Sequence, residues 1–218
     1  NPDVTVEVQG GGSGQGIKSI EDGIADIGSL SREVGEDEKG SISEEYVIAK
    51  DGVAVIVNAD VNVDDLSLEQ IKGIYTGEIK NWSEVGGADQ NIVVIGRESG
   101  SGTRDAFEEI LDIADQCQLA QTLNETGAVA AAVQSTPGAI GYISLDALND
   151  KVKALQLDGV APSEETVKDG SYTLQRPFVM ATKGEISEQS AQVQAVFEFS
   201  NSDAGQEVIS SVGVVSAK

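Results

Sequence analysis

One stretch of this sequence joins an apolar run to a helical pattern through small and hydroxyl-bearing residues. Residues 92–95 are all Ile or Val, and residues 96–104 read Gly-Arg-Glu-Ser-Gly-Ser-Gly-Thr-Arg. Phe107, Ile110 and Leu111 then recur at helical spacing. The pattern predicts a buried strand that turns directly into a helix. The N-terminus of such a helix carries unpaired N–H groups and a partial positive charge, so it attracts anions.

Two interpretations of this stretch remain open from its residues alone. Ser101 or Thr103 can serve as a helix cap in a turn that binds no ligand. Alternatively, the small residues let an oxyanion approach the backbone while Arg97 donates two parallel hydrogen bonds to it. A Walker phosphate loop is excluded, because that pattern needs Lys before the final hydroxyl residue and position 102 is Gly.

Two further loops show similar chemistry. Residues 4–8 alternate as a strand does, residues 10–16 are glycine-rich and contain Ser13, and a helical pattern opens at residue 17. The glycine spacing does not fit a dinucleotide-binding fingerprint, and a tight turn without a ligand is the alternative. Residues 25–30 read as a short strand that ends at Ser31 and Arg32.

Composition excludes several classes of function. The net charge of −23 makes nucleic acid and anionic membrane surfaces poor partners, and it is compatible with a saline habitat. The chain has no His, which removes Ser-His-Asp and Cys-His catalysis. Cys117 is the only cysteine and is expected to pack as a small apolar residue. Residues 60–71 open like a calcium loop but have Asp65 and Ile71 where Gly and Glu are required, so no metal site is expected.

The remaining pattern alternates strands and helices. The longest β-rich stretch, residues 46–58, is broken at Asp51 and Gly52, and a carboxylate there needs a partner or a function. Ser67 and Gln70 predict a capping box, and Trp82 is expected in the core. Other expected strands are residues 139–143, 152–157, 177–182 and 212–215, and other expected helices are residues 127–134, 188–199 and 203–211. This order predicts an α/β fold with a largely parallel sheet.

In an open α/β sheet, loops that follow strands converge at the carboxyl ends of those strands. The loops at Ser13, Ser31 and residues 97–103 would together supply N–H and O–H donors and a guanidinium. They contain no nucleophile–base pair. Such a set is suited to binding a tetrahedral oxyanion without changing it.

The sequence resembles the phosphate-binding component of Pst-type ABC importers, a family of class II periplasmic binding proteins. The resemblance extends over essentially the whole chain. It rests on seven motifs in family order, which are residues 12–18, residues 25–28 with Ser31 and Arg32, residues 51–58, residues 74–79 with Asn81 and Trp82, Arg97 with residues 99–103, residues 137–142, and Arg176 with Pro177.

The resemblance implies a two-lobed fold of mixed, mostly parallel sheets joined by two crossover strands. Lobe I would comprise residues 1–52 and 144–218, and lobe II residues 53–143. The crossovers are expected near residues 51–55 and 140–143.

By the family pattern, phosphate would bind between the lobes. The donors would be Ser13, Gly14, Ser31, Arg97, Ser101, Gly102 and Thr103, with Ser99 nearby. Some family members carry a carboxylate at the position of Ser31 that accepts the proton of hydrogen phosphate. We expect Asp51 to take that role here, which would disfavour the unprotonated sulfate ion.

The resemblance implies a transport receptor and not an enzyme, and it implies no cofactor or metal. The receptor would lie outside the cytoplasm, in the periplasm or at the cell surface, and its full-length precursor would carry a membrane anchor. Its partners would be phosphate and the permease subunits of an ABC transporter. The alternatives are a receptor for sulfate, molybdate or tungstate, a phosphate sensor, and, less favoured, a phosphatase. The family pattern begins with a strand, a phosphate-contacting loop and a helix ahead of residues 4–8, and we expect this unit to have been clipped or to come from another chain or segment.

Overall fold

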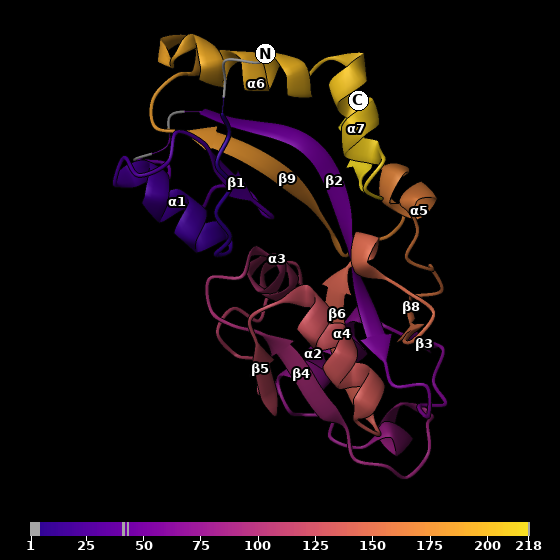
Figure 1. Ribbon diagram of the computed structural model, residues 1–218. Coiled ribbons are helices and arrows are strands. Elements are labelled where there is room, and N and C mark those ends of the chain that lie inside the picture. Colours follow the sequence, from indigo (N-terminus) through magenta and orange to yellow (C-terminus); the bar gives the residue numbers. More distant parts are fainter. Residues whose placement is uncertain (1–4, 41, 43, 218) are drawn as a thin grey trace.

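The computed structural model describes residues 5–40, 42 and 44–217, and these form two lobes joined by a long strand (Figure 1). The helices are α1 (Ser13–Glu21), α2 (Leu68–Tyr75), α3 (Gly102–Ile110), α4 (Thr126–Ser135), α5 (Glu164–Lys168), α6 (Ala191–Ser200) and α7 (Asp203–Ser210). The strands are β1 (Gly28–Leu30), β2 (Glu44–Val57), β3 (Asp65–Leu66), β4 (Val93–Arg97), β5 (Gln121–Leu123), β6 (Ala139–Ser144), β7 (Lys153–Ala154), β8 (Gln156–Leu157), β9 (Gln175–Thr182) and β10 (Val215–Ser216).

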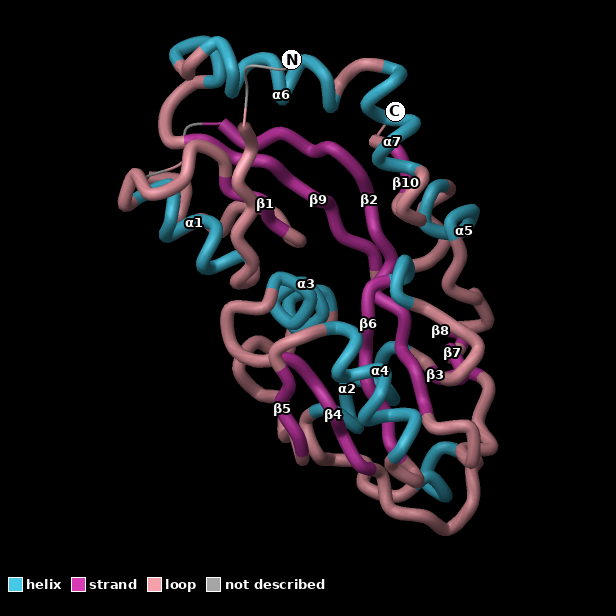
Figure 2. Tube along the Cα trace, in the orientation of Figure 1, coloured by secondary structure: helices cyan, strands magenta, loops and turns pink. Residues whose placement is uncertain are grey.

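The sheet of the first lobe contains β1, β9, β10 and the first half of β2, and helices cover both of its faces (Figure 2). On one face, Val179 and Ala181 of β9 pack with Ile17 and Ile20 of α1. On the other face, Met180 packs with residues of α6. Successive β9 side chains therefore enter opposite layers, as the two-residue period of a strand requires.

The second lobe is built on the order β2-β6-β4-β5. Along the second half of β2, Val53, Val55 and Val57 enter a core with α2 and α3, whereas Ala54 and Ile56 pack toward α4. A strand buried on both faces reads as a continuous apolar run, which is what residues 53–57 show.

The fold class is confirmed, but the expected parallel majority is not observed. Strand β2 pairs antiparallel with β6, β7, β9 and β10, and the parallel pairs are β3–β8, β4–β5 and β4–β6. The alternation of strands and helices predicted the βα units around β4. It did not predict that one long strand would run through both lobes and serve as the antiparallel partner of several others.

Two predicted strands differ from those observed. Strand β2 is continuous through Asp51 and Gly52, which pair with Arg176 and Gln175 of β9. Residues 5–8 form no strand, and Val6 and Val8 are 67% and 88% exposed. An alternating pattern becomes a strand only when a neighbour pairs with it, and none of the described residues pairs with this segment. Position 4 lies outside the described residues.

The predicted boundary at residue 144, where the chain would pass from lobe II back to lobe I, stays a prediction. The pairing of the strands after residue 144 favours a boundary at a higher residue number. β7 pairs with Ile56 and Val57 of β2, and β8 pairs with β3. Leu155 and Leu174 also belong to the core formed by Val53, Val55 and α2. The first crossover, near residue 51, lies where the partner of β2 changes from β9 to β6.

Local predictions in the second lobe are confirmed. The Ser67 hydroxyl accepts from the Gln70 amide at 3.2 Å, and the Gln70 side chain accepts from the Ser67 amide at 2.9 Å, which completes the capping box. Trp82 is 1% exposed, and its indole N–H donates to the Gly138 carbonyl at 2.9 Å. Cys117 is half-buried and packs against the core of this lobe.

The partner of Asp51 is Arg176, directly opposite it on β9. One Asp51 oxygen accepts from Arg176 Nε at 3.1 Å and Nη2 at 2.8 Å and from the Ser144 hydroxyl at 2.6 Å, and the other accepts from the Leu145 amide at 3.2 Å. The two charged side chains are at most 3% exposed. This buried ion pair therefore lies where strands of the two lobes meet.

Because an unpaired buried carboxylate is costly, Arg176→Met is expected to lower the free energy of unfolding by about 3–5 kcal/mol, and adding Asp51→Asn should recover part of that loss. Urea denaturation at pH 7 measures both. The exposed pair Lys18–Asp22 provides the control, since Lys18→Met should cost less than about 1 kcal/mol. An Arg176→Met variant as stable as the Lys18→Met variant would contradict this account.

Candidate functional site

The glycine-rich segment before α1 faces the loop before α3 across the two lobes. The Gly14 amide donates to the Gly100 carbonyl at 3.4 Å. A Cβ atom at Gly12 would come within 2.8 Å of the same carbonyl oxygen, and Gly12 has a φ of 81°. Glycine thus permits both the left-handed backbone and the close approach of the two loops.

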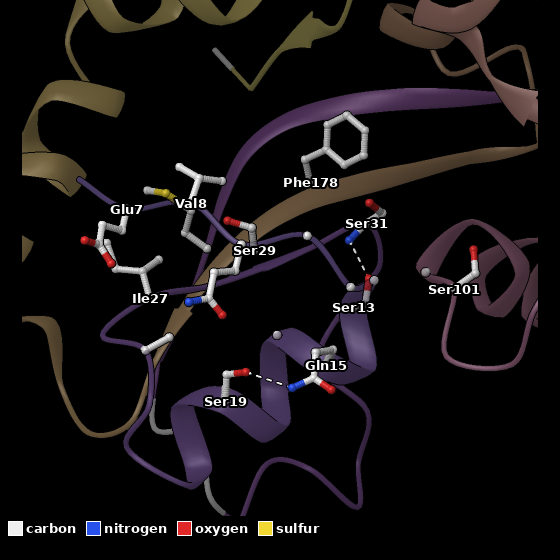
Figure 3. A pocket seen from close by; sticks show the side chains of 18 of the residues that line it. Glu7, Val8, Ser13, Gln15, Ser19, Ile27, Ser29, Ser31, Ser101 and Phe178 are labelled. Carbon is white, nitrogen blue, oxygen red and sulfur yellow. Dashed lines mark hydrogen bonds between the residues drawn. The ribbon is translucent and has the colours of Figure 1, made fainter. Parts of the chain in front are cut away.

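Ser13, Ser31 and Gly102 form the closest part of this contact. Ser31 follows β1, and its amide donates to the Ser13 hydroxyl at 3.0 Å (Figure 3). A Cβ atom at Gly102 would overlap the Ser13 hydroxyl and would lie 3.0 Å from the Ser31 Cβ. Position 102 therefore brings the first turn of α3 against two hydroxyl residues of the opposite lobe, and no larger side chain fits there.

Two helix N-termini consequently open onto the same region. The Ser101 hydroxyl caps α3 by accepting from the Arg104 amide at 3.4 Å. The Gly102 and Thr103 amides lie in the first turn of α3 and have no intrahelical acceptor, so they are free to serve a ligand. Helix α1 begins at Ser13 without a side-chain cap. Such termini offer N–H donors together with a positive potential.

Arg97 ends β4 with its guanidinium held rigidly. Nε and Nη2 donate to the two oxygens of Glu98 at 3.0 and 2.9 Å, Nη2 donates to the Asn124 carbonyl at 3.1 Å, and Nη1 donates to the Thr126 hydroxyl at 3.1 Å. A guanidinium has five N–H donors, so one on Nη1 remains for a ligand. Arg97 as a whole is 8% exposed.

These residues border a cavity of about 940 Å³ between the lobes. Six of the nine predicted site residues line it, namely Ser13, Ser31, Arg97, Ser101, Gly102 and Thr103. Gly14 is engaged with Gly100 instead, and Ser99 is exposed outside the cavity wall. The cavity also reaches α6, where Val193 and Val196 line it.

Asp51 does not line the cavity, in contrast to its predicted role as a proton acceptor. Its oxygens are occupied by the donors of Arg176, Ser144 and Leu145, and the residue is 1% exposed. Burial raises the pKa of Asp51, while Arg176 and the Ser144 hydroxyl oppose the rise. The carboxylate thus anchors neighbouring side chains and lies behind the wall.

The prediction left out several wall residues, among them Thr126, Ser144, Asp146 and Arg176. The motif of Arg176 and Pro177 does not by itself indicate a role for this arginine. Its Nη1 is buried and has no hydrogen-bond partner, and its guanidinium carbon lies 5.3 Å from the centre of the Phe178 ring. Thr126 begins α4, and the helical pattern of that segment could have drawn attention to it.

The two arginines at this wall are each paired with a carboxylate. Arg97 is paired with Glu98, and Arg176 is paired with Asp51. Burial raises the pKa of the Glu98 carboxyl, but the hydrogen bonds from Arg97 and from the Glu98 backbone, together with the charges of Arg97 and Arg104, hold that pKa below its usual value. The attraction for an anion therefore comes chiefly from oriented N–H and O–H groups, which act at contact distance.

A family model for the PBP superfamily domain matches residues 1–204. The phosphate-binding protein PstS of Bacillus subtilis is 39% identical in an alignment of 191 positions that covers 85% of this chain and 63% of that protein. PstS of Staphylococcus haemolyticus is 30% identical in an alignment of 224 positions that covers 94% of this chain and 70% of that protein. This chain belongs to the PstS-like phosphate-binding proteins of the PBP superfamily.

Solved structures agree with this family assignment. An ABC-transporter substrate-binding protein with bound phosphate from Clostridium perfringens is 39% identical, with a TM-score of 0.93 over 100% of this chain and 89% of that chain. An ABC-type phosphate transport receptor from Vibrio cholerae is 33% identical, with a TM-score of 0.85 over 98% of this chain and 89% of that chain. The predicted family is thus confirmed. Among the described residues of this member, no helix is long and apolar enough to cross a membrane.

The Arg97–Glu98 pair makes stability depend on pH in a defined direction. A carboxyl whose pKa is lowered by folding stabilises the fold above its ordinary pKa of 4.5, and the contribution is lost as the pH falls through the folded-state value. Glu98→Gln should cost up to about 1 kcal/mol at pH 7, and this cost should shrink below pH 4.5. Urea denaturation between pH 3 and 7 measures it. Glu109→Gln, at an exposed position of α3, is the control, and an equal pH trend in both variants would contradict the role given to Glu98.

Proposed function

We propose that this chain binds inorganic phosphate as the extracytoplasmic receptor of an ABC phosphate importer. The observation that carries the proposal is the meeting of the α1 and α3 N-termini at Ser13 and Gly102, beside the remaining donor of Arg97. The relatives in Bacillus subtilis and Staphylococcus haemolyticus are named phosphate-binding proteins, and the similar structure from Clostridium perfringens holds phosphate.

The chemistry of the wall suits binding without reaction. Ser31, Ser101 and Thr103 bring hydroxyls to the wall, and the first turn of α3 brings amides. The sequence has no His that could act as the base of a nucleophile–base pair. Several donors that converge on one anion replace the water it loses on entering the cleft. A transport receptor needs this property, because it must release its ligand unchanged.

Membership in the family also supports the proposed location and partners. A receptor of this kind works outside the cytoplasm and delivers phosphate to the permease subunits of its transporter. A membrane anchor on the full-length precursor remains part of this proposal. The Vibrio cholerae relative is described as an ABC-type phosphate transport receptor.

We further propose that a strand and helix from another segment or chain complete the first lobe. β1 is an edge strand of the described sheet, with β9 as its partner. The part of the cavity next to it is lined by apolar side chains of Val6, Val8, Ile27, Val193 and Val196. An added strand would pair with the edge of β1 and cover these side chains.

Gly102→Ala provides a direct test of the proposed anion site. The added methyl group would collide with Ser13 and separate the two walls, so phosphate affinity measured by calorimetry should fall at least about tenfold. Gly127→Ala is the matched control, since Gly127 lies in the first turn of α4 with open space around it. The phosphate affinity of this variant should stay within about twofold of that of the unaltered chain. Equal affinities in the two variants would refute this location for the site.

Competition between anions separates phosphate from sulfate, molybdate and tungstate. The chain should keep most of its phosphate affinity when it is titrated in excess sulfate. Equal affinities for phosphate and sulfate would instead support a receptor for oxyanions in general. Since Asp51 lies behind the wall, Asp51→Asn should leave the ratio of phosphate to sulfate affinity within about threefold. A collapse of that ratio would restore Asp51 as the proton acceptor.

A further inference from the structure

Arg32 follows the proposed phosphate ligand Ser31, and its guanidinium joins two carboxylates. Nη1 and Nη2 donate to the two oxygens of Glu38 at 2.7 and 2.8 Å, and Nη1 also donates to the Glu33 carbonyl at 2.8 Å. Nε donates to an oxygen of Asp105 at 3.1 Å. The Arg32 side chain is 12% exposed, whereas its partner Asp105 is 33% exposed.

The two carboxylates belong to different lobes. Glu38 lies in the loop between β1 and β2, whereas Asp105 is the fourth residue of α3. The Arg32–Asp105 bond thus links the residue after Ser31 to the helix that begins at Gly102. It spans the place where the two walls of the cavity meet.

We propose that Arg32 is a positioning residue for the anion site: its bond to Asp105 fixes the spacing between Ser31 and the first turn of α3, and so increases the affinity for phosphate. This inference rests on the proposed function. Arg32 itself is absent from the cavity wall, so it acts through the groups beside it and not by contact with the ion.

The geometry favours a reversible link over a permanent one. Glu38 binds Arg32 through two parallel bonds and also accepts from the Gly35 amide at 2.8 Å, so the guanidinium stays in place on the first lobe. The bond to the second lobe is single, and the Asp105 side chain is 33% exposed. When the lobes separate, Asp105 remains favourable at a helix N-terminus because its charge opposes the helix dipole.

Phosphate titration of Asp105→Asn tests the proposal by the sign of its effect. Removal of a negative charge near an anion site should strengthen binding if only the electrostatic field matters. If Asp105 holds the walls in register, binding should instead weaken about fivefold, with a faster dissociation rate. Unchanged or tighter binding would overturn the proposal.

A double-mutant cycle adds a second criterion. Arg32→Gln should weaken phosphate binding to a similar degree, and Arg32→Gln with Asp105→Asn should be no weaker than the poorer single variant. Lys39→Gln, which removes an exposed ion pair with Glu36 in the neighbouring loop, should stay within about twofold of the original. Fully additive losses would show that the two residues act separately and would reject the link.

Failure of the proposed function would be recognised separately. If the unaltered chain binds no phosphate, the receptor proposal fails, and small-angle scattering of the ligand-free chain then tests the link itself. Asp105→Asn should increase the radius of gyration relative to the unaltered chain and to Lys39→Gln. An identical radius in all three, together with absent phosphate binding, would remove the positioning role as well.

Discussion

The buried pair of Asp51 and Arg176 lies where strand β2 passes from one lobe into the other. Strand β2 pairs with β9 up to Gly52 and with β6 from Val53 onward. The Asp51 carboxylate binds Arg176 of β9 and Ser144 at the end of β6, so one side chain holds together three strands of two lobes. Buried charges tolerate little misplacement because the interior cannot replace a lost partner. This connection therefore fixes where the loops that follow β1 and β4 can meet.

The site that forms at that meeting contains donors without a large surplus of charge. Arg97 and Arg176 are each neutralised by a carboxylate of their own. A net charge of −23 repels anions at long range, but screening limits that repulsion to about 10 Å at moderate salt. Amides of α3 and hydroxyls of Ser13 and Ser31 act within contact distance. Short-range donors in a shielded cleft thus outweigh the unfavourable surface charge, because the effective dielectric constant there is lower.

Sequence patterns predicted those features that depend on neighbouring residues. The capping box at Ser67, the buried strand before Arg97 and the helix after Gly102 follow from local spacing, and they are observed. The partners of individual charged side chains were not predictable. Asp51 and Arg176 are 125 positions apart, and Arg32 and Asp105 are 73 positions apart, so no local pattern joins them. Residues 5–8 form no strand for the same reason, since the alternation predicted to make one carries no information about a pairing neighbour.

Because Asp51 lies behind the cavity wall, other groups would have to discriminate between phosphate and other oxyanions. Amides only donate, and a carboxylate behind the wall cannot reach a ligand proton. Hydroxyls can both donate and accept, so Ser31 and Thr103 supply acceptors on a wall otherwise rich in donors. A site of this composition can rotate a hydroxyl to meet either the monoanion or the dianion of phosphate. Its preference for phosphate over sulfate would rest on the acceptors that the wall does present to the ion, which include these hydroxyl lone pairs and the Asp146 carboxylate.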